Sequence, residues 1–357
     1  MENANKSEEK SFLRKIVRNK GIIFISIGIV IRIFMLLYYY YSHTIDPGKS
    51  WGDVGYNYNN YTSINYPPLA IIILVFLRFI SFGLFEVFVL WAFFLDILTV
   101  LMFYFVIKNF DIPKKKFAFG LFLINPFFFL NNSFSLQNCG YHITDAFFFF
   151  FLFMALIFYP KKDNRSKILF YIFLALSIAA KIYTFPVIGF FFLKFIIEKD
   201  WKELKMFLIT TISVLFLFLI VPIFFGENFL LTYLYWNARG ETLIPLYIRL
   251  IPVSILIILF LLFRLKKADI FEIIIFSIVV TASVMFFSNP FVRYFQPLLF
   301  YGILKHKEFF SFKLNLGIIK GKITVDNHII TFVLSIFAVV LAYLLIILVF
   351  DLFYSSF

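Results

Sequence analysis

Apolar runs long enough to cross a lipid bilayer recur along the whole chain, and residues 21–41, 86–107 and 329–350 are the clearest of them. A membrane-spanning helix needs about 20 mostly apolar residues, which each of these runs supplies. Of the 357 residues, 62% are hydrophobic and 15% are charged. Soluble domains carry about 25% charged residues, so this chain has too few to cover an ordinary water-facing surface. The sequence therefore predicts an all-α, polytopic bundle of transmembrane helices.

The basic residues give the chain a net charge of +13. They gather in the N-terminal arm and in short segments between the apolar runs, where the positive-inside rule places them on the cytoplasmic side. The clusters lie at 10–20, 114–116, 161–167, 199–205, 264–267 and 305–322. Because this distribution gives the charge a topological cause, we expect no nucleic-acid partner.

The segment 66–85 decides the predicted topology. It opens with a Tyr-Pro-Pro sequence and is interrupted by Arg78 and Gly83. If this segment crossed the membrane, the next run would carry the lysines of 114–116 to the outside, against the positive-inside rule. If it dips in and returns, or lies in the interface, every later basic cluster stays inside. We therefore predict a re-entrant or interfacial segment, which requires protein or water around any irregular backbone.

The remaining runs complete roughly eleven predicted spans, with the N-terminus in the cytoplasm and the C-terminus outside. They are 21–41, 86–107, 117–133, 145–159, 168–181, 184–197, 206–224, 248–263, 270–287, 294–304 and 329–350, and the pair around Lys181 and Pro186 reads as one broken helix pair. The predicted parts of the chain are a cytoplasmic arm at 1–20, a main transmembrane domain at 21–304 with an outer loop at 42–85, a cytoplasmic basic loop at 305–328, and a last transmembrane helix within 329–357.

Ionisable residues also gather in the segments predicted to face outward. Such groups at or just inside a helix end are costly in a membrane and point to function by default. Arginine and lysine side chains can instead extend to the interface, which explains Arg78 as well as function does. The same explanation fails for Asp46, Asp53 and Asp145, because aspartate is too short to reach far.

Asp96 lies well inside the run 86–107, away from the predicted outer face. An acid at that depth usually has a partner. We therefore favour a packing role for Asp96 over a catalytic one.

The outer loop has an acid soon after the first span and ends in Tyr66-Pro67-Pro68-Leu69. This arrangement resembles the GT-C class of polytopic glycosyltransferases, most closely the mannosyltransferase-like members that use dolichyl- or polyprenyl-phosphate sugars. Further segments are similar to parts of that family and follow the same order. They are Leu95-Asp96-Ile97, Asn125-Pro126 followed by Gln137, His142 and Asp145, the segment from Lys181 to Pro186, and Arg293-Tyr294-Phe295-Gln296-Pro297.

The resemblance implies an inverting glycosyltransferase with a GT-C-like catalytic domain over residues 21–304. It would move one sugar, with mannose favoured, from a polyprenyl-phosphate donor to a hydroxyl of a glycan or glycolipid acceptor on the extracytoplasmic side. A carboxylate must take the acceptor proton. Asp46 fits the family's spacing to Tyr66 better, whereas Asp53 has the tyrosine that often follows the acid, at Tyr56, so both acids stay candidates.

The departing phosphate needs cations nearby, because negative charge develops on its oxygens. The predicted donor-binding cations are Lys181, Arg239 and Arg293. The predicted substrate-binding residues are Tyr56, Tyr66, Gln137, His142 and Asp145, of which the last two read equally well as a polar pair at a helix end.

The sequence requires no cofactor. Its four histidines, at 43, 142, 306 and 328, are scattered, so we predict no protein metal site. A divalent cation such as Mg²⁺ or Mn²⁺, held by two carboxylates and the donor phosphate, is compatible with the sequence. The expected partners are the lipid-linked donor, the acceptor and membrane lipid.

Three other functions compete with glycosyl transfer. A transporter or flippase would have polar groups near the bilayer midplane, broken helices and two similar halves, and no such halves are visible in the sequence. A non-catalytic scaffold would tolerate the loss of Asp46 and Asp53. An oligosaccharide polymerase or ligase would need a larger outer loop than 225–247.

Overall fold

The computed structural model describes several stretches of the chain. They are residues 20–45, 58–59, 66–110, 112, 115–124, 143–159, 161–225, 246–288, 312–315 and 322–325.

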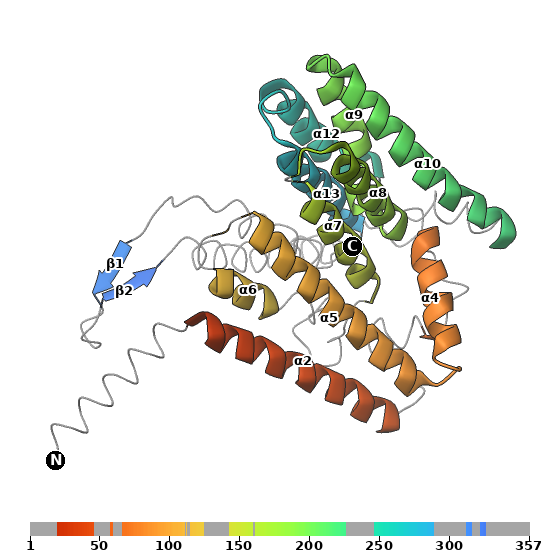
Figure 1. Ribbon diagram of the computed structural model, residues 1–357, viewed down its shortest axis with the longest axis vertical. Helices are drawn as coiled ribbons and strands as arrows, with labels where there is room; N and C mark the ends of the chain where they lie inside the picture. Colours follow the sequence, from red (N-terminus) through yellow and green to blue (C-terminus); the bar gives the residue numbers. More distant parts are fainter. Residues whose placement is uncertain are drawn as a thin grey trace, which may run out of the picture.

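The described chain is almost entirely helical (Figure 1). The helices are α2 (Lys20–Ile45), α4 (Pro68–Ile80), α5 (Phe85–Asn109), α6 (Lys115–Leu123), α7 (Ile143–Phe158), α8 (Asn164–Ala180), the short 3-10 helix η3 (Ile182–Thr184), α9 (Val187–Ile197), α10 (Trp201–Phe225), α12 (Leu246–Phe263) and α13 (Ile270–Ser288). This agrees with the predicted all-α class. The exception is an antiparallel pair of short strands, β1 (Phe312–Asn315) and β2 (Lys322–Val325), inside the stretch predicted as a basic loop.

Most of the helices begin and end within a few residues of the predicted spans. Helix α6 is described as far as Leu123, and residues 125–133 of the predicted span 117–133 lie outside the described residues. The predicted spans 294–304 and 329–350 lie outside the described residues.

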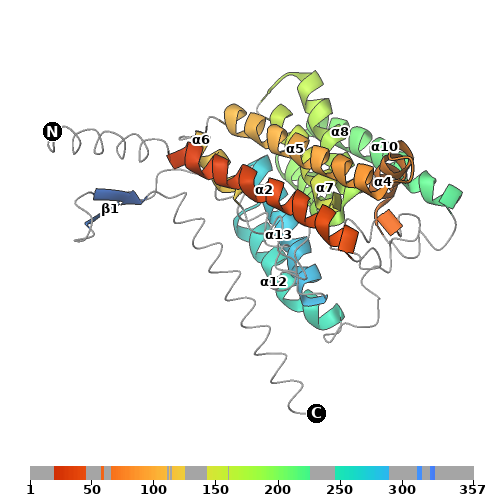
Figure 2. The ribbon, with the colours of Figure 1, turned by 90° about the horizontal axis from the view of Figure 1, so that it is seen from below.

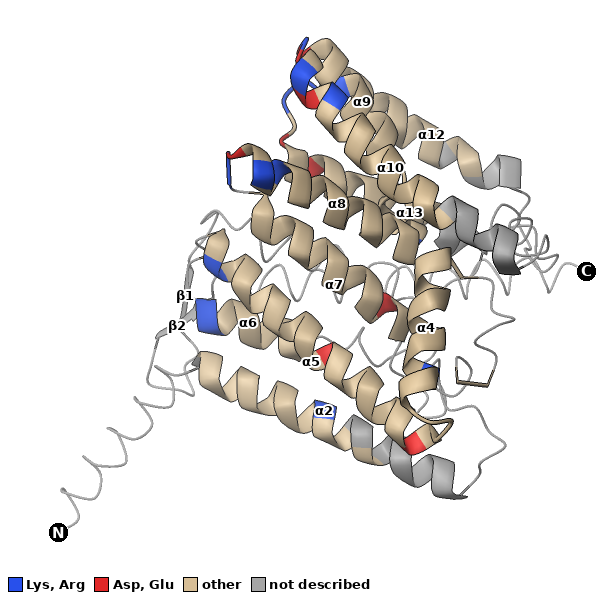
Figure 3. Cartoon of the chain, turned by 45° about the vertical axis from the view of Figure 1, so that its right-hand side comes forward, with Lys and Arg blue, Asp and Glu red and all other residues tan. Residues whose placement is uncertain are grey.

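Most of the described lysines and arginines gather at one end of the bundle, which we call the basic end (Figure 3). It is formed by the connections from α5 to α6, α7 to α8, α9 to α10 and α12 to α13. Successive helices therefore run alternately toward and away from this end. The opposite end, which we call the far end, contains α4, the starts of α5 and α7, and the end of α8 with η3. Four of the clusters predicted to be cytoplasmic thus lie at the same end of the bundle, as they must if they share one side of a membrane.

Three helices that leave the basic end begin directly after an aspartate. The carboxylates of Asp163, Asp200 and Asp269 each accept a hydrogen bond from the backbone N–H three residues later, at 2.9, 3.0 and 2.8 Å. These bonds satisfy N–H groups that have no partner inside the helix. The caps therefore fix where α8, α10 and α13 start.

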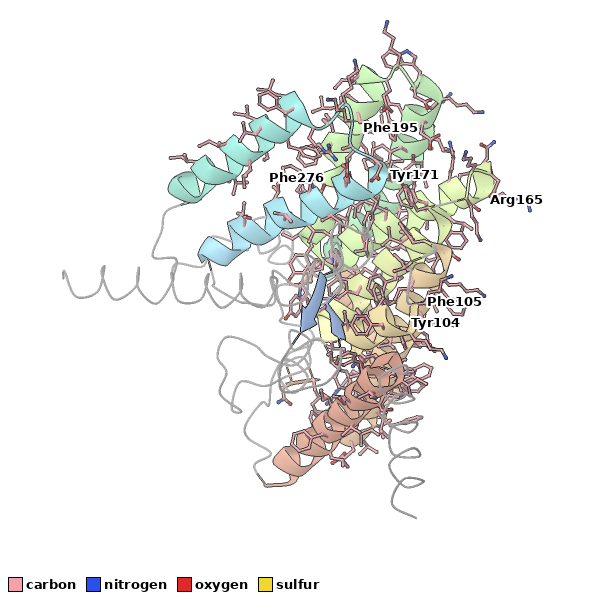
Figure 4. All side chains as sticks on the ribbon, turned by 90° about the vertical axis from the view of Figure 1, so that its left-hand side faces the viewer. Tyr104, Phe105, Arg165, Tyr171, Phe195 and Phe276 are labelled. Carbon is pink, nitrogen blue, oxygen red and sulfur yellow. The ribbon has the colours of Figure 1, made fainter. Side chains whose placement is uncertain are left out.

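Aromatic side chains fill the core and also cover the outside of the bundle. Tyr171 and Phe195 are buried between neighbouring helices, whereas Tyr104 and Phe105 lie exposed on α5 (Figure 4). In a water-soluble protein such exposed rings would be unfavourable.

The helix α4 differs from the others in direction and length. It lies across the direction of α2 and α5 rather than along it (Figures 1 and 2). Its 13 residues reach about 20 Å, less than the roughly 30 Å of a bilayer's hydrocarbon core. Pro68 suits its first turn, because proline has the φ angle of a helix and lacks an N–H that would need a partner. The segment 66–85 is therefore a short transverse helix and a turn.

The helices α2 and α6 approach each other through glycines. A Cβ added to Gly28 would lie 2.4 Å from Leu123 Cβ, and one added to Gly120 would lie 2.6 Å from Phe24 Cβ. Small residues let helix backbones come this close, as is common between membrane helices. The close contact also brings the end of α6 against the middle of α2.

By length and composition alone, one helix with described side chains is able to cross a membrane, namely α5 with 25 residues. Together, helix α8 and the segment Ile182–Ile197 are also long and apolar enough to cross a membrane, and they meet at a bend of 118°. This agrees with the predicted broken helix pair. The described stretches also contain shorter apolar helices, including Ile143–Phe158 and Val253–Phe263. The count of roughly eleven spans stays a prediction.

Candidate functional site

The break between α8 and α9 places a lysine inside the far end. Lys181 follows the last residue of α8 in an extended conformation, with φ −160° and ψ 134°, and ends the helix there. The turn η3 follows, and α9 begins after Pro186, which fits a helix start because it lacks an N–H. Inside the turn, the hydroxyls of Ser177 and Thr184 are hydrogen-bonded at 3.1 Å. These contacts hold the Lys181 side chain toward the interior.

Lys181 forms an ion pair with Asp145 across the bundle. Its Nζ donates a hydrogen bond to Asp145 Oδ1, and the two side chains are only 5% and 8% exposed. The same Nζ lies 3.5 Å from Thr144 Oγ1 and 4.8 Å from the centroid of the Tyr183 ring. A buried charge requires such compensation, because the interior solvates it poorly. The pair therefore ties α7 to the break after α8.

The position of Asp145 also favours its charge. It lies in the first turn of α7, where the free N–H groups and the helix dipole stabilise an anion. Lys181 therefore pairs with a carboxylate at the electropositive end of a helix.

Tyr66 and α4 complete the far end beside this pair. The buried side of α4 packs in one apolar cluster with Ile143 and Phe147 of α7 and with Ala179 and Ala180 of α8. Tyr66, just before the helix, is half-buried and packs on the same cluster. The Tyr-Pro-Pro segment therefore lies next to the elements that carry Asp145 and Lys181.

The structure thus brings together elements carrying three of the predicted site residues, Tyr66, Asp145 and Lys181, from α4, α7 and α8. The other predicted site residues lie outside the described part of the chain, namely Asp46, Asp53, Tyr56, Gln137, His142, Arg239 and Arg293.

The ion pair changes how two of the predictions are understood. Lys181 was predicted as a cation for the donor phosphate and Asp145 as a substrate contact or as a partner of His142. Because each compensates the charge of the other, Lys181 does not offer a full uncompensated charge to an anion. An incoming phosphate would share Lys181 with Asp145 or replace it.

A second buried pair lies between the two ends and was not predicted. Arg32 Nε donates to Asp96 Oδ2 at 2.8 Å, and Arg32 Nη1 donates to the backbone oxygen of Leu123 at 2.6 Å. Asp96 thus has the partner that its depth required. The guanidinium also satisfies a carbonyl at the end of α6, where a cation is favoured by the helix dipole. The other carboxylate oxygen, Asp96 Oδ1, is buried without a hydrogen-bond partner among the described residues.

Within the described stretches, the structure contains no cluster of three or more histidine, cysteine, aspartate or glutamate side chains that could hold a metal ion. The divalent cation considered from the sequence would depend on Asp46 and Asp53, which lie outside these stretches.

Comparisons with protein-family models, with curated proteins and with solved structures give no significant match to this chain.

Proposed function

We propose that this chain is a polytopic integral membrane protein whose basic end faces the cytoplasm. Large apolar side chains are exposed on several helices, for example Val30 on α2, Phe94 on α5, Leu217 on α10 and Phe263 on α12. Contiguous apolar surface of this kind is unstable in water and normal in lipid. The gathering of lysines and arginines at one end supports the orientation.

We further propose that the chain is a glycosyltransferase that takes one sugar, with mannose favoured, from a polyprenyl-phosphate carrier. The observation that supports this most is the meeting at the far end of the elements that carry Tyr66, Asp145 and Lys181. These residues belong to three separate segments that resemble the GT-C class. In the proposed orientation they lie on the extracytoplasmic side, where lipid-linked sugars would be used.

The proposed reaction is a single inverting displacement. Asp46 or Asp53 takes the proton of the acceptor hydroxyl, and the acceptor oxygen attacks the anomeric carbon. The bond from that carbon to the phosphate oxygen breaks, and the polyprenyl phosphate leaves with the electron pair. Lys181, Arg239 and Arg293 are the cations proposed to stabilise the charge on the leaving phosphate. Asp145 would hold the ammonium of Lys181 in position for that contact.

The test is transfer from radiolabelled polyprenyl-phosphate sugars to a membrane extract by the purified full chain. We expect transfer by the parent and its loss in either Asp46→Asn or Asp53→Asn, which identifies the base. We also expect loss in Lys181→Met.

A double variant separates chemistry from folding. Lys181→Met with Asp145→Asn removes both charges, so the fold should recover while transfer stays absent. The matched control is Lys194→Met, because Lys194 is also buried but lies near the basic end, paired with Glu198 at 2.6 Å. Folded parent protein that transfers no sugar from any polyprenyl phosphate would contradict the proposal, as would full activity in both loop-one variants.

Two observations favour a transporter or flippase as the second candidate. The Arg32–Asp96 pair lies at mid-length in the bundle, and the break between α8 and α9 is sharply bent. Broken helices and polar groups at such depth are typical of transporters. Movement of a fluorescent lipid phosphate across vesicle membranes, abolished by Asp96→Asn and present without any transfer activity, would favour this candidate.

A further inference from the structure

The corner between α4 and α5 exposes a row of large apolar side chains, which we call the aromatic corner. Its members are Phe76, Phe79, Phe82 and Leu84, which are 57%, 77%, 87% and 55% exposed. Phe82 and Phe79 are the two most exposed large apolar side chains that the structure describes. Several exposed apolar side chains at one turn require an environment less polar than water.

The helix α4 separates its two faces cleanly. Ala70, Leu74 and Leu77 are buried against the bundle, whereas Phe76 and Phe79 point away from it. The outward face therefore does not contribute to the core, and its apolar character has another cause.

The turn after α4 is held in a strained shape that keeps Phe82 outside. Phe82 has a φ of 52°, in the left-handed region that a phenylalanine rarely adopts. The Ser81 hydroxyl donates to the Leu77 carbonyl oxygen at 2.6 Å, and the Leu84 N–H donates to the Ser81 carbonyl oxygen at 2.8 Å. The Tyr58 hydroxyl donates to the carbonyl oxygen of Gly83. Several contacts thus maintain a conformation whose main visible result is an exposed aromatic ring.

Charged and amphipathic groups flank the aromatic corner. The guanidinium of Arg78 lies 3.5 Å from the centroid of the Tyr58 ring, and Glu86 is exposed at the start of α5. Arginine with a tyrosine ring is a combination typical of the boundary between water and lipid. These groups would mark the level of the lipid headgroups, with the phenylalanines just beneath it.

We infer that the aromatic corner is an in-plane membrane anchor, inserted into the outer leaflet at the boundary of headgroups and acyl chains. The occupant of this surface is the bilayer itself. Exposed apolar residues also follow along α5, among them Leu90 and Phe94, which would face lipid. The transverse direction of α4 suits a helix that lies in the interface (Figures 1 and 2). The inference rests on the proposed membrane placement and is independent of the proposed transfer reaction.

Depth-dependent fluorescence quenching tests this anchor. In a Cys139→Ser parent, Phe82→Cys and separately Phe79→Cys are labelled with an environment-sensitive dye, and the full chain is reconstituted into phosphatidylcholine vesicles. Lipids brominated near the headgroup, lipids brominated near the bilayer centre and aqueous iodide serve as quenchers. We expect shallow bromine to quench both labels most, and iodide to quench them several-fold less than a label at Lys202→Cys.

Two control positions calibrate the result. Lys202→Cys lies exposed at the basic end and should respond to iodide, whereas Phe94→Cys lies along α5 and should respond to the deeper bromine. Iodide quenching at 82 and 79 equal to that at 202 would overturn the anchor, as would labels that no quencher reaches. If the label at 94 also responds mainly to iodide, the membrane placement fails as well.

Discussion

The two ends of the bundle use charge in different ways. At the basic end, Glu203 accepts hydrogen bonds from Lys167 at 2.5 Å and from Tyr171 at 2.6 Å, and the Lys167 side chain is still 36% exposed. Aspartate caps begin the neighbouring helices. At the far end, Lys181 and Asp145 meet with almost no exposure. The Lys167–Glu203 pair of the basic end is thus partly open to solvent, whereas the Lys181–Asp145 pair of the far end is enclosed.

Membrane topology explains the charges at the basic end, but it does not explain the buried pair at the far end. Lysines near short connections and caps at helix starts are what a membrane helix bundle needs on its cytoplasmic side. A pair enclosed beside a broken helix is not needed for either purpose. Burying it is expensive and stabilises little compared with apolar side chains of the same size. Its position therefore supports a functional role at the far end.

Lys181→Met gives the largest expected effect and tests the contrast directly. The change removes the ammonium that compensates the buried Asp145 carboxylate, so we expect the free energy of unfolding to fall by about 3–5 kcal/mol. Thermal or denaturant unfolding of the purified protein in detergent measures it. Lys167→Met is the matched change at the basic end and should lower the free energy of unfolding by no more than about 1 kcal/mol. Equal losses at the two ends would remove the contrast.

Gly28→Ala tests the region between the ends and should have a smaller effect. The new Cβ would lie 2.9 Å from the backbone carbon of Leu123. Since backbone cannot move aside as easily as a side chain, α2 and α6 should separate, at a loss of about 1–3 kcal/mol.

A glycine without close neighbours supplies the control for this change. Gly189 on α9 has nothing within 4 Å of an added Cβ, so Gly189→Ala should leave stability unchanged or raise it by about 0.5–1 kcal/mol. If the two alanine variants unfold alike, the close approach of α2 and α6 does not matter energetically.

Replacement of Asp163 should have the smallest effect, which appears in the way that stability depends on pH. Hydrogen bonds from the hydroxyl and the backbone N–H of Ser166 hold the pKa of Asp163 below its ordinary value of 3.8. Because the folded-state pKa is lowered, its contribution to stability is complete above the unfolded pKa and is lost as pH falls through the folded one. Asp163→Ala should flatten the decline of melting temperature between about pH 5 and pH 2. An unchanged decline would show that this cap is unimportant at the basic end.

Much of the helix pattern was predictable because the apolar runs and the charged clusters that interrupt them are strong signals. The helices α5 and α13 match their predicted runs closely. The aspartates at 163, 200 and 269 stand just before helix starts, with serine or glutamate three residues later, a pattern typical of caps. The basic clusters were predicted to share one side, and those that the structure describes between its helices lie at one end of the bundle, whereas the side of a membrane that this end faces stays a prediction.

The contacts within the far end were less predictable. Lys181 and Asp145 were both placed in outer segments, but their direct pairing depends on how α7 and α8 rotate about their axes, which the apolar pattern does not specify.

The partner of Asp96 carried a usable signal. Arg32 lies twelve residues into α2 and Asp96 thirteen residues before the end of α5. At 1.5 Å per residue, both lie about 18–20 Å from the basic end. A comparison of how deep the charged residues lie inside neighbouring apolar runs would have predicted the Arg32–Asp96 pair.

The backbone carbonyl of Leu123 in α6 accepts a hydrogen bond from Arg32 of α2, where the two helices also meet through glycines. In a bilayer, α6 apart from α2 would lose this hydrogen bond, and both the Leu123 carbonyl and the Arg32 guanidinium would meet hydrocarbon without it. In the proposed membrane placement, α2 should therefore still be close to the translocon when α6 emerges from the ribosome. A crosslink between the two on ribosome-bound chains would report this, and its absence would argue for later pairing. Helix α2 thus serves as a template for a helix made some ninety residues later.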